Sequence, residues 1–286
     1  MKNIIVSRFF VFAVLSSSIA ISCSDEFLDV AVQGGVTTDT DPALATKLVT
    51  GVYNSLLQGD SWGRGDVHGF AFISVTSIMS DDADKGSTPS DQVVPVGDID
   101  NFTITATNVF AESLWKGHYY AIGTANKALR ELENAAISPE DKVRFQGEVR
   151  FIRAYLYFNL VRMFGGVPLV VRVPVDAADA NDDPSFRERA SVESVYANII
   201  ADLEFAATNL PLASVEYTGH ATKGAAQSLL AKVYMYKSEW PKVLALTNEV
   251  ITSGRYALLD DYAKIWRQEG DNSKESIFEV QTGEFN

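Results

Sequence analysis

The sequence predicts a mainly α-helical protein, built on tetratricopeptide-like helix pairs with irregular loops and a minor strand. Several long segments carry apolar residues at helical spacing, and most of them begin at a residue that can cap a helix and end at glycine or proline. One short stretch near the end of the chain looks like a strand. The 286 residues are 47% hydrophobic and 21% charged, so a core can form without disulfide bonds.

The first helix is expected to begin at Asp41-Pro42, because the aspartate can accept hydrogen bonds from free N–H groups and proline suits the first turn. Apolar residues follow at every fourth position from Leu44 to Leu56, and Gly59 ends the helix. The next segments are a glycine-rich loop at 59–69, a helix at 70–80 and an irregular connection at 81–106. A connection as long as the last one is usually functional or disordered.

The longer helices are expected in the rest of the chain. Their predicted bounds are about Asn108 to Asn134, Ser138 to the stop at Gly165-Gly166, Ser191 to Pro211, 222–237, and 239–253 up to Gly254. Residues 165–190 are expected to be a partly extended connection, and 276–281 looks like a strand. Trp115, on the first of these helices, is expected to lie in the core.

The last helix pair fits the spacing of the tetratricopeptide repeat. The matching positions are Leu230-Ala231, Tyr234, Val243 and Val250, although the consensus tryptophan and late proline are absent. Ala231 supplies the small residue that such a pair needs where its helices cross. Trp240 is expected to pack within this pair.

The N-terminus has the order of a secretory signal. Two basic residues, Lys2 and Arg8, precede an apolar run from Phe9 to Leu15, and small residues follow. We therefore expect residues 1–22 to be a signal peptide. A short buried helix is the alternative.

Cys23 is the only cysteine of the chain, and it stands where the signal would be cleaved. A lone cysteine in an exported protein forms no internal disulfide and needs another explanation. Lipidation of the thiol supplies one, with residues 23–40 as lipid anchor and tether and residues 41–286 as the helical domain. Ordinary cleavage that leaves a free thiol is the alternative.

Charge and motif content exclude several classes of function. The net charge of −13 repels phosphate backbones, so nucleic acid is not expected as a partner. The chain lacks the zinc-protease, nucleophile-elbow and P-loop motifs. His68, His118 and His220 lie far apart in the sequence and have no metal-ligand spacing. We therefore predict no catalytic residue, no metal ligand and no cofactor.

Asp82, Asp84 and Gly86 resemble the start of a calcium loop, in which several oxygens and a sharp turn hold the ion. The distal glutamate of an EF-hand is missing, because Val93 stands at its position. A solvated acidic turn is therefore favoured over a metal site.

Trp62 is the aromatic residue most suited to contact a ligand. It lies among the glycines of the 59–69 loop, where its ring has no obvious core to join. The ring can be a stacking platform for a sugar, or it can plug the loop against the helices, and both interpretations stay open. Asp60, Asp82 and Asp84 are candidates for hydrogen bonds to ligand hydroxyls, because ionised carboxylates are strong acceptors.

Four stretches of the chain resemble one family. They are Phe27-Leu28-Asp29, Arg150 to Leu169, Ala221 to Tyr234 (ATKGAA and LAKVY), and Ser276 to Gln281. Their order and content look like the SusD/RagB family of outer-membrane nutrient-binding lipoproteins of Bacteroidetes, which implies a SusD-like α-α superhelix. The Arg150–Leu169 stretch is the most specific. Its alternating small and aromatic residues indicate packing, and Ala154 is expected at a close helix crossing.

The resemblance also implies a function. Members of the family are non-catalytic subunits that capture oligosaccharides or sometimes peptides, cap a TonB-dependent (SusC-like) outer-membrane barrel and hand the ligand to it. The chain would then be anchored in the outer membrane through Cys23 and face the cell exterior, as the acidic Asp25-Glu26 after the cysteine also indicates. Members generally run considerably longer, so the chain is expected to be the N-terminal portion of such a protein.

The ligand stays open at this level. An exposed aromatic platform around Trp62 would favour a glycan, whereas a long apolar groove would favour a peptide or a protein partner. A hydrolase with unrecognised carboxylates is a third hypothesis, because a catalytic pair cannot be chosen without geometry.

Overall fold

The computed structural model describes residues 38–281 except 39, 61–64, 89–90 and 92, and it describes Asp60 for its backbone alone. The chain divides into two units, 1–37 and 38–286, and the described residues all belong to the second. Cys23 and Trp62 lie outside the described residues.

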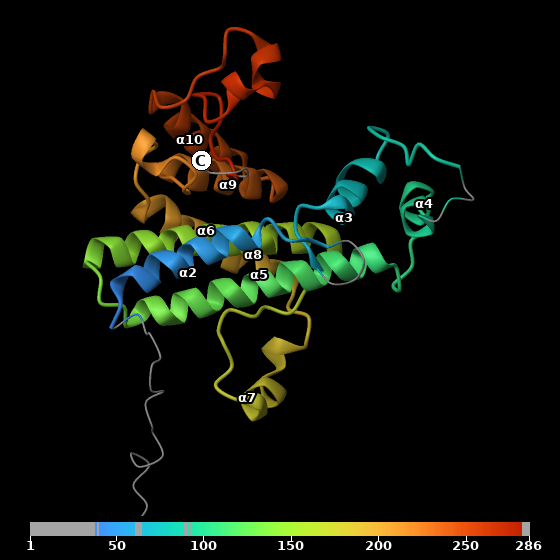
Figure 1. The fold of residues 1–286 in the computed structure, drawn as a ribbon, viewed down its shortest axis with the longest axis horizontal. Helices are drawn as coiled ribbons and strands as arrows, with labels where there is room; N and C mark the ends of the chain where they lie inside the picture. The colour runs from blue at the N-terminus through green and yellow to red at the C-terminus, as the bar shows by residue number, and fades with distance from the viewer. Residues whose placement is uncertain (1–37, 39, 61–64, 89–90, 92, 282–286) are drawn as a thin grey trace, which may run out of the picture. The chain divides into compact units, whose positions relative to one another are not determined.

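Three long helices form the centre of the described unit. They are α2 (Pro42–Ser55), α5 (Val109–Glu133) and α6 (Pro139–Phe164), which lie side by side (Figure 1). Their facing sides carry the main hydrophobic core, which contains Val52, Ile122, Ile152 and Leu156. The mainly helical fold predicted from the sequence is therefore confirmed.

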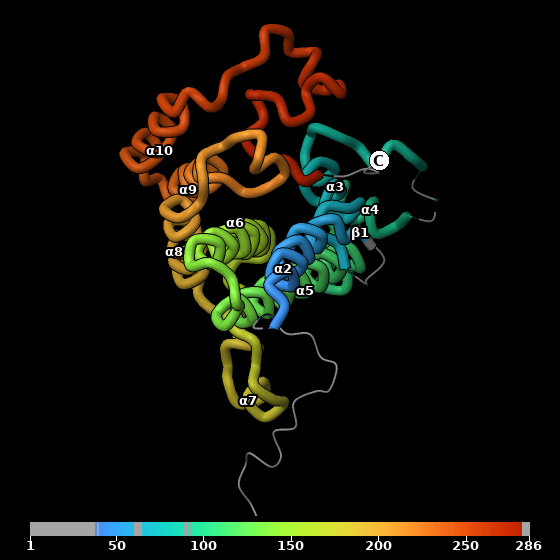
Figure 2. The backbone as a smooth tube through the Cα atoms, turned by 60° about the vertical axis from the view of Figure 1, so that its left-hand side comes forward, coloured from blue at the N-terminus to red at the C-terminus, as the bar shows by residue number. Residues whose placement is uncertain are grey.

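The other long helices continue this packing in chain order. Helix α8 (Val192–Asn209) packs on α6, α9 (Lys223–Tyr236) on α8, and α10 (Trp240–Thr252) on α9 (Figure 2). Gly147 of α6 lets Leu210 approach closely, because a Cβ there would lie 3.1 Å from a methyl carbon of Leu210. The predicted helix pair at the end is present, with Ala231 and Tyr234 buried.

The helix ends follow the predicted caps. The side chain of the residue before each helix accepts a hydrogen bond from a first-turn N–H at Asp41, Asn108, Ser138, Ser191 and Thr222. Gly165, which follows α6, has a φ of 70°, a conformation that favours glycine. These local interactions explain why the helix bounds could be read from the sequence.

A smaller lobe forms around a second apolar cluster that includes Ile78, Ile99, Phe110 and Leu114. Its helices are α3 (Phe70–Ile73), the π-helix η2 (Ser74–Ile78) and α4 (Val94–Asp100). The prediction that 81–106 is irregular throughout is wrong, because α4 lies within it. Val96 and Ile99 are buried against the lobe, and this tertiary burial stabilises a helix that the polar composition conceals.

The predicted loop at 59–69 contains a short antiparallel pair, β1 (Gly59–Asp60) and β2 (Gly65–Asp66). The 165–190 connection contains α7 (Ala177–Asp182) and the 3-10 turn η3 (Pro184–Phe186). Three further 3-10 turns are η4 (Val215–Tyr217), η5 (Tyr262–Trp266) and η6 (Gln268–Gly270).

The strand predicted at 276–281 is wrong: within the described part of the chain this segment pairs with no other strand. Its apolar residues Ile277, Phe278 and Val280 instead pack on the helical core. The ring of Phe278 meets that of Phe151 edge-on, with 5.2 Å between centroids. The 276–281 segment, whose apolar pattern resembles a strand, thus packs as an irregular segment on the helical core.

Trp115 and Trp240, both predicted to pack inside the protein, differ in their burial. Trp115 packs on the core, with ring centroids 4.9 Å from Tyr119 and 5.3 Å from Phe164, as predicted. Trp240 is 58% exposed, so its predicted packing role is wrong. It is the first residue of α10, so the turns that follow it in the helix carry the packing of the pair. None of the helices that the structure describes is both long and apolar enough to cross a membrane.

Candidate functional site

The base of the hairpin that bears Trp62 is fixed to α5. Asp66 is fully buried, and its carboxylate accepts hydrogen bonds from the N–H groups of Gly69 at 2.7 Å and Ala71 at 3.1 Å. Gly117 of α5 is needed here, because a Cβ on it would overlap the backbone of Asp66. The β1–β2 pair is therefore held against α5 at Asp66, whereas the side chain of Asp60 and the whole of Trp62 lie outside what the structure describes.

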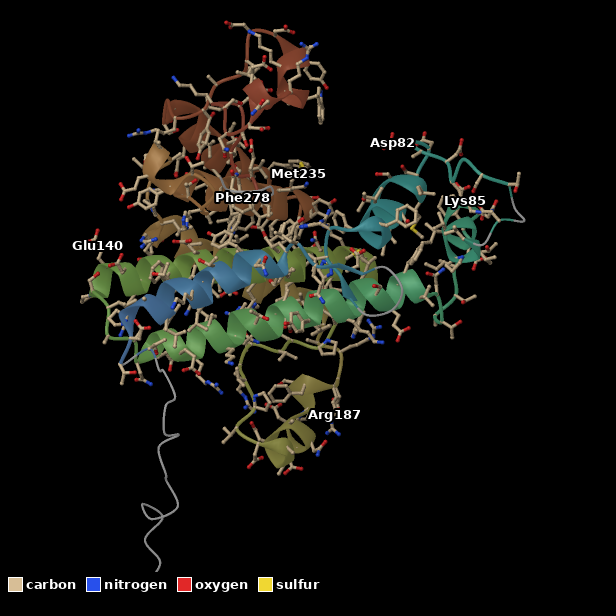
Figure 3. The ribbon with its side chains drawn as sticks, viewed as in Figure 1. Asp82, Lys85, Glu140, Arg187, Met235 and Phe278 are labelled. Carbon is tan, nitrogen blue, oxygen red and sulfur yellow. The ribbon has the colours of Figure 1, made fainter. Side chains whose placement is uncertain are left out.

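Asp82 and Asp84 are both exposed, on the turn that follows η2 (Figure 3). Lys85, between them and α4, forms an ion pair with Asp91 at 2.6 Å. The hydrogen bond from Lys85 lowers the pKa of Asp91 to about 2. The cation of this loop is thus engaged by Asp91, which leaves Asp82 and Asp84 facing solvent.

The histidines have separate partners in the structure. His68 contacts the Tyr155 hydroxyl at 2.7 Å, and His118 is buried against the Leu114 carbonyl at 2.8 Å. Burial lowers the pKa of His118 to about 4, so it is neutral at physiological pH. Among the described residues, no group of three or more His, Cys, Asp or Glu side chains is placed to hold a metal ion.

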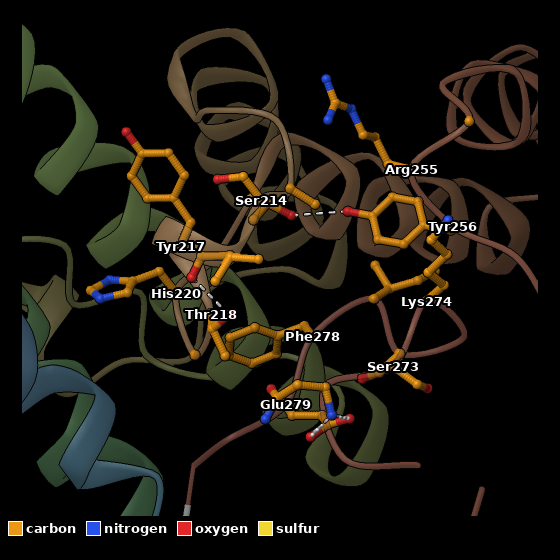
Figure 4. A pocket seen from close by; sticks show the side chains of 18 residues that line it. Ser214, Tyr217, Thr218, His220, Arg255, Tyr256, Ser273, Lys274, Phe278 and Glu279 are labelled. Carbon is orange, nitrogen blue, oxygen red and sulfur yellow. Dashed lines mark hydrogen bonds between the residues drawn. The ribbon is translucent and has the colours of Figure 1, made fainter. Parts of the chain in front are cut away.

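A pocket that the sequence did not reveal lies near the C-terminal end of the described chain (Figure 4). It has a volume of about 360 Å³ and is lined from within three stretches, 213–222, 254–256 and 272–279. We call it the C-terminal pocket. None of its lining residues comes from the 59–69 or 81–101 loops, so the structure does not bring the predicted ligand residues to it.

The lining of the C-terminal pocket mixes aromatic, hydroxyl and charged side chains. Tyr217, Tyr256 and Phe278 supply the rings, and Arg255 and Lys274 supply the cations. The hydroxyl groups of Tyr256 and Thr222 lie 3.1 Å apart and join the 254–256 stretch to the start of α9. Rings together with many hydrogen-bonding groups are the chemistry that a polyhydroxylated ligand needs.

One wall of the pocket is held by a buried carboxylate. Glu148 of α6 is 1% exposed and accepts hydrogen bonds from Tyr53, Arg144 and His220, each at 2.8 Å. The Tyr53 hydroxyl in turn accepts from the N–H of Ala221 at 2.7 Å. This network ties the 213–222 stretch to α2 and α6.

His220 is the member of this network that also faces the pocket. Its hydrogen bond to Glu148 raises the pKa of the imidazole, because the carboxylate favours the protonated ring. Burial, and then the charge of Glu148, raise the pKa of the Tyr53 hydroxyl well above its usual value. The charged and titratable members of this network are therefore the Glu148 carboxylate, the permanently cationic Arg144 and the titratable His220.

Comparison with protein families gives one match over most of the chain. A SusD-like family, described as starch-binding and associating with the outer membrane, matches residues 26–235. Among curated relatives, SusD-like protein P25 of Formosa agariphila is 26% identical over 98% of this chain and 51% of its own length. A SusD-like protein of Bacteroides ovatus is 27% identical over 91% of this chain and 47% of its own length.

Solved structures show the same fold. A laminarin binding SusD-like protein is 30% identical, with a TM-score of 0.69 over 82% of this chain and 50% of that one. Surface glycan-binding protein A from Bacteroides uniformis has a TM-score of 0.71 over 83% of this chain and 52% of that one, and at 24% identity it supports the fold alone. The chain spans about half the length of the relatives it matches.

Proposed function

This chain belongs to the SusD-like family, and from that premise we propose that it is a cell-surface lipoprotein that binds nutrient glycans. In this proposal it delivers oligosaccharides to a TonB-dependent, SusC-like outer-membrane transporter. The protein binds the glycan and does not cleave it. The observation that carries the proposal is the family match over residues 26–235.

The relatives support a carbohydrate ligand. The solved relative at 30% identity is a laminarin binding SusD-like protein. Another solved structure with a similar fold is a surface glycan-binding protein from Bacteroides thetaiotaomicron in complex with laminarihexaose. A β-glucan such as laminarin is therefore the first probe to use with this chain.

The chemistry of the described residues agrees with such a ligand, because the C-terminal pocket offers rings and hydroxyl groups. We propose Trp62 as a stacking platform, with Asp60, Asp82 and Asp84 as acceptors for sugar hydroxyls. Acceptor carboxylates suit hydroxyl-rich ligands better than anionic ones.

The proposed organisation of the chain follows from the same function. Residues 1–22 direct export, Cys23 carries the lipid, and residues 23–40 tether the helical domain that begins at 41. A lipid anchor holds the domain at the outer membrane, where it can meet both an incoming glycan and the barrel. Extraction of outer membranes with mild detergent and affinity capture of this protein should recover a TonB-dependent barrel.

The ligand is tested by affinity electrophoresis in gels that contain laminarin, starch, xylan or mannan. We expect one glycan to retard the wild-type protein, and Trp62→Ala to weaken that retardation without a change in the unfolding midpoint. Trp240→Ala is the matched control, because it removes an exposed ring outside the proposed site. Loss of stability with unchanged affinity would make Trp62 a plug of the loop. Shortened oligosaccharides after incubation would point to a hydrolase.

A further inference from the structure

A groove runs along the outer face of α2 beside α5. It consists of two adjoining hollows of about 350 Å³ and 320 Å³, which share Gly51 and Asn54. On α2 and the turn after it the groove extends from Thr46 to Gln58, and α5 contributes Tyr120 and Thr124. We call this the α2–α5 groove. At 1.5 Å per residue the helical part of this side, Thr46 to Ser55, is about 14 Å long, enough for more than one linked sugar ring.

Tyr120 is the aromatic side chain of the groove. It is 64% exposed, although its neighbours Ala121 and Ile122 on α5 are completely buried. An aromatic ring left this open presents an apolar face to the solvent at the edge of a hollow. Such a ring can stack on the apolar face of a sugar, and its two side-chain torsions keep the cost of ordering small.

The polar groups around the ring are mostly uncharged. Asn54 supplies an exposed side-chain amide with donors and an acceptor, and Thr124 supplies a hydroxyl. The amide of Gln58 also lines the groove, but its Oε1 is buried. Lys47 is the single charged side chain among the residues that line the groove. A phosphate or carboxylate ligand would require several cations, so this lining favours a neutral hydroxyl-rich ligand.

The groove is built on rigid elements. Helix α2 is fixed by Ala45, Val49 and Val52, all of which are buried, and it packs directly on α5 (Figures 1 and 2). Gln58, at the end of the groove, lies against Gly65 in the base of the hairpin that bears Trp62. The groove is therefore formed by helix positions that the core already fixes, as a binding site built on rigid elements requires.

We propose that the α2–α5 groove binds a stretch of a neutral oligosaccharide, with Tyr120 stacked on one sugar ring and the amide of Asn54 hydrogen-bonded to the sugar hydroxyls. The inference rests on the proposed function and adds a contact surface that shares no lining residue with the C-terminal pocket.

Gly51 allows a direct test by filling the groove. A Cβ placed on Gly51 meets no atom of another part of the described chain within 4 Å, so the side chain of Gly51→Phe starts in open space and is expected to extend into the groove. Gly51→Ala is the matched control, because it removes the same helix-interior glycine but adds one methyl group. Both variants should unfold at the wild-type midpoint or above it, since glycine is a poor helix former.

The experiment measures calorimetric affinity for the glycan that retards wild-type protein in the laminarin, starch, xylan and mannan gels. We expect Tyr120→Ala and Gly51→Phe each to weaken binding by about tenfold or more, equivalent to about 1.4 kcal/mol. Gly51→Ala and Trp240→Ala should stay within about twofold of wild type, which is below 0.5 kcal/mol by the same conversion.

The outcomes separate the groove from the proposed function. If the wild-type protein binds a glycan and both Tyr120→Ala and Gly51→Phe bind it with wild-type affinity, the proposal that the α2–α5 groove binds the glycan is refuted. The proposed function then stands. If none of the four glycans binds wild type, both proposals fail. If a casein-digest peptide binds and Gly51→Phe abolishes that binding, the groove is a peptide site and the glycan assignment is wrong.

Discussion

Asp202→Ala is expected to be among the most destabilising single changes in this protein, because it leaves a buried guanidinium without its counterion. Arg153 of α6 donates two hydrogen bonds to the Asp202 carboxylate of α8, from Nε and from Nη2, each at 2.8 Å. Its Nη1 donates to Asn126 at 2.8 Å and to the Val171 carbonyl at 3.2 Å. Both charged side chains are less than 10% exposed.

The size of the effect follows from this burial. Removing one partner of a buried ion pair costs about 3–5 kcal/mol, because the remaining charge stays in a poorly solvating environment. Domains are typically stable by about 5–15 kcal/mol, so this one change removes a large share of the total. Asn126 and Val171 accept from Nη1 alone, so Nε and Nη2 lose the acceptor that the carboxylate provides.

The assay is urea unfolding followed by far-ultraviolet circular dichroism. The double variant Arg153→Met, Asp202→Leu should recover most of the lost stability, because neither buried charge then remains. Glu112→Gln is the control: Glu112 pairs with Lys116 at 2.6 Å, but both side chains are about half exposed, so we expect a loss below about 1 kcal/mol. If Asp202→Ala loses no more than Glu112→Gln, the assignment of Arg153–Asp202 as a structural ion pair is refuted.

Three further predictions concern other parts of the chain. His220 has a raised pKa in the folded state, so its hydrogen bond to Glu148 contributes stability that is complete below the unfolded pKa of about 6.5 and is lost as pH rises through the folded pKa. His220→Gln should therefore flatten the fall in the urea midpoint between these two pKa values. A pH profile identical to that of the wild type would contradict this. Ala154 is fully buried, so Ala154→Trp should overpack the core and cost about 1–3 kcal/mol, and a wild-type unfolding midpoint would count against it. Cys23→Ala should release the protein from membranes or stall the precursor, whereas a variant that still fractionates as a lipidated membrane protein would rule out the anchor.

The family signature was readable because it belongs to the scaffold. The Arg150–Leu169 stretch contains Arg153, whose partners lie on α5, α8 and the connection after α6. It also contains Tyr157, whose hydroxyl donates to the Val170 carbonyl and accepts from the Val170 N–H. Most residues of its helical part are buried, and the ligand contacts we propose lie elsewhere.

Secondary structure was predictable where local interactions decide it and not where tertiary contacts do. Ser138 caps α6 through Asp141, three residues away, and Gly165 ends that helix through its own backbone freedom. By contrast, the 276–281 segment has the side chains of a strand, but strand formation needs a pairing partner. In the fold its apolar residues pack on the surface of the helices instead, and Phe278 contacts Phe151.

The sequence by itself determined the helical scaffold and its family, because caps, stops and apolar spacing act within a few residues. Tertiary structure alone decided which polar groups meet. Glu148 joins Tyr53, which is far before it, to His220, which is far after it, and no local pattern could have predicted that network. The exposure of Tyr120 likewise depends on how α2 lies beside α5, since neighbouring positions on the same helix are completely buried. Burial and long-range pairing are properties of the packed chain, and they place the pocket and the groove where sequence spacing carries no signal.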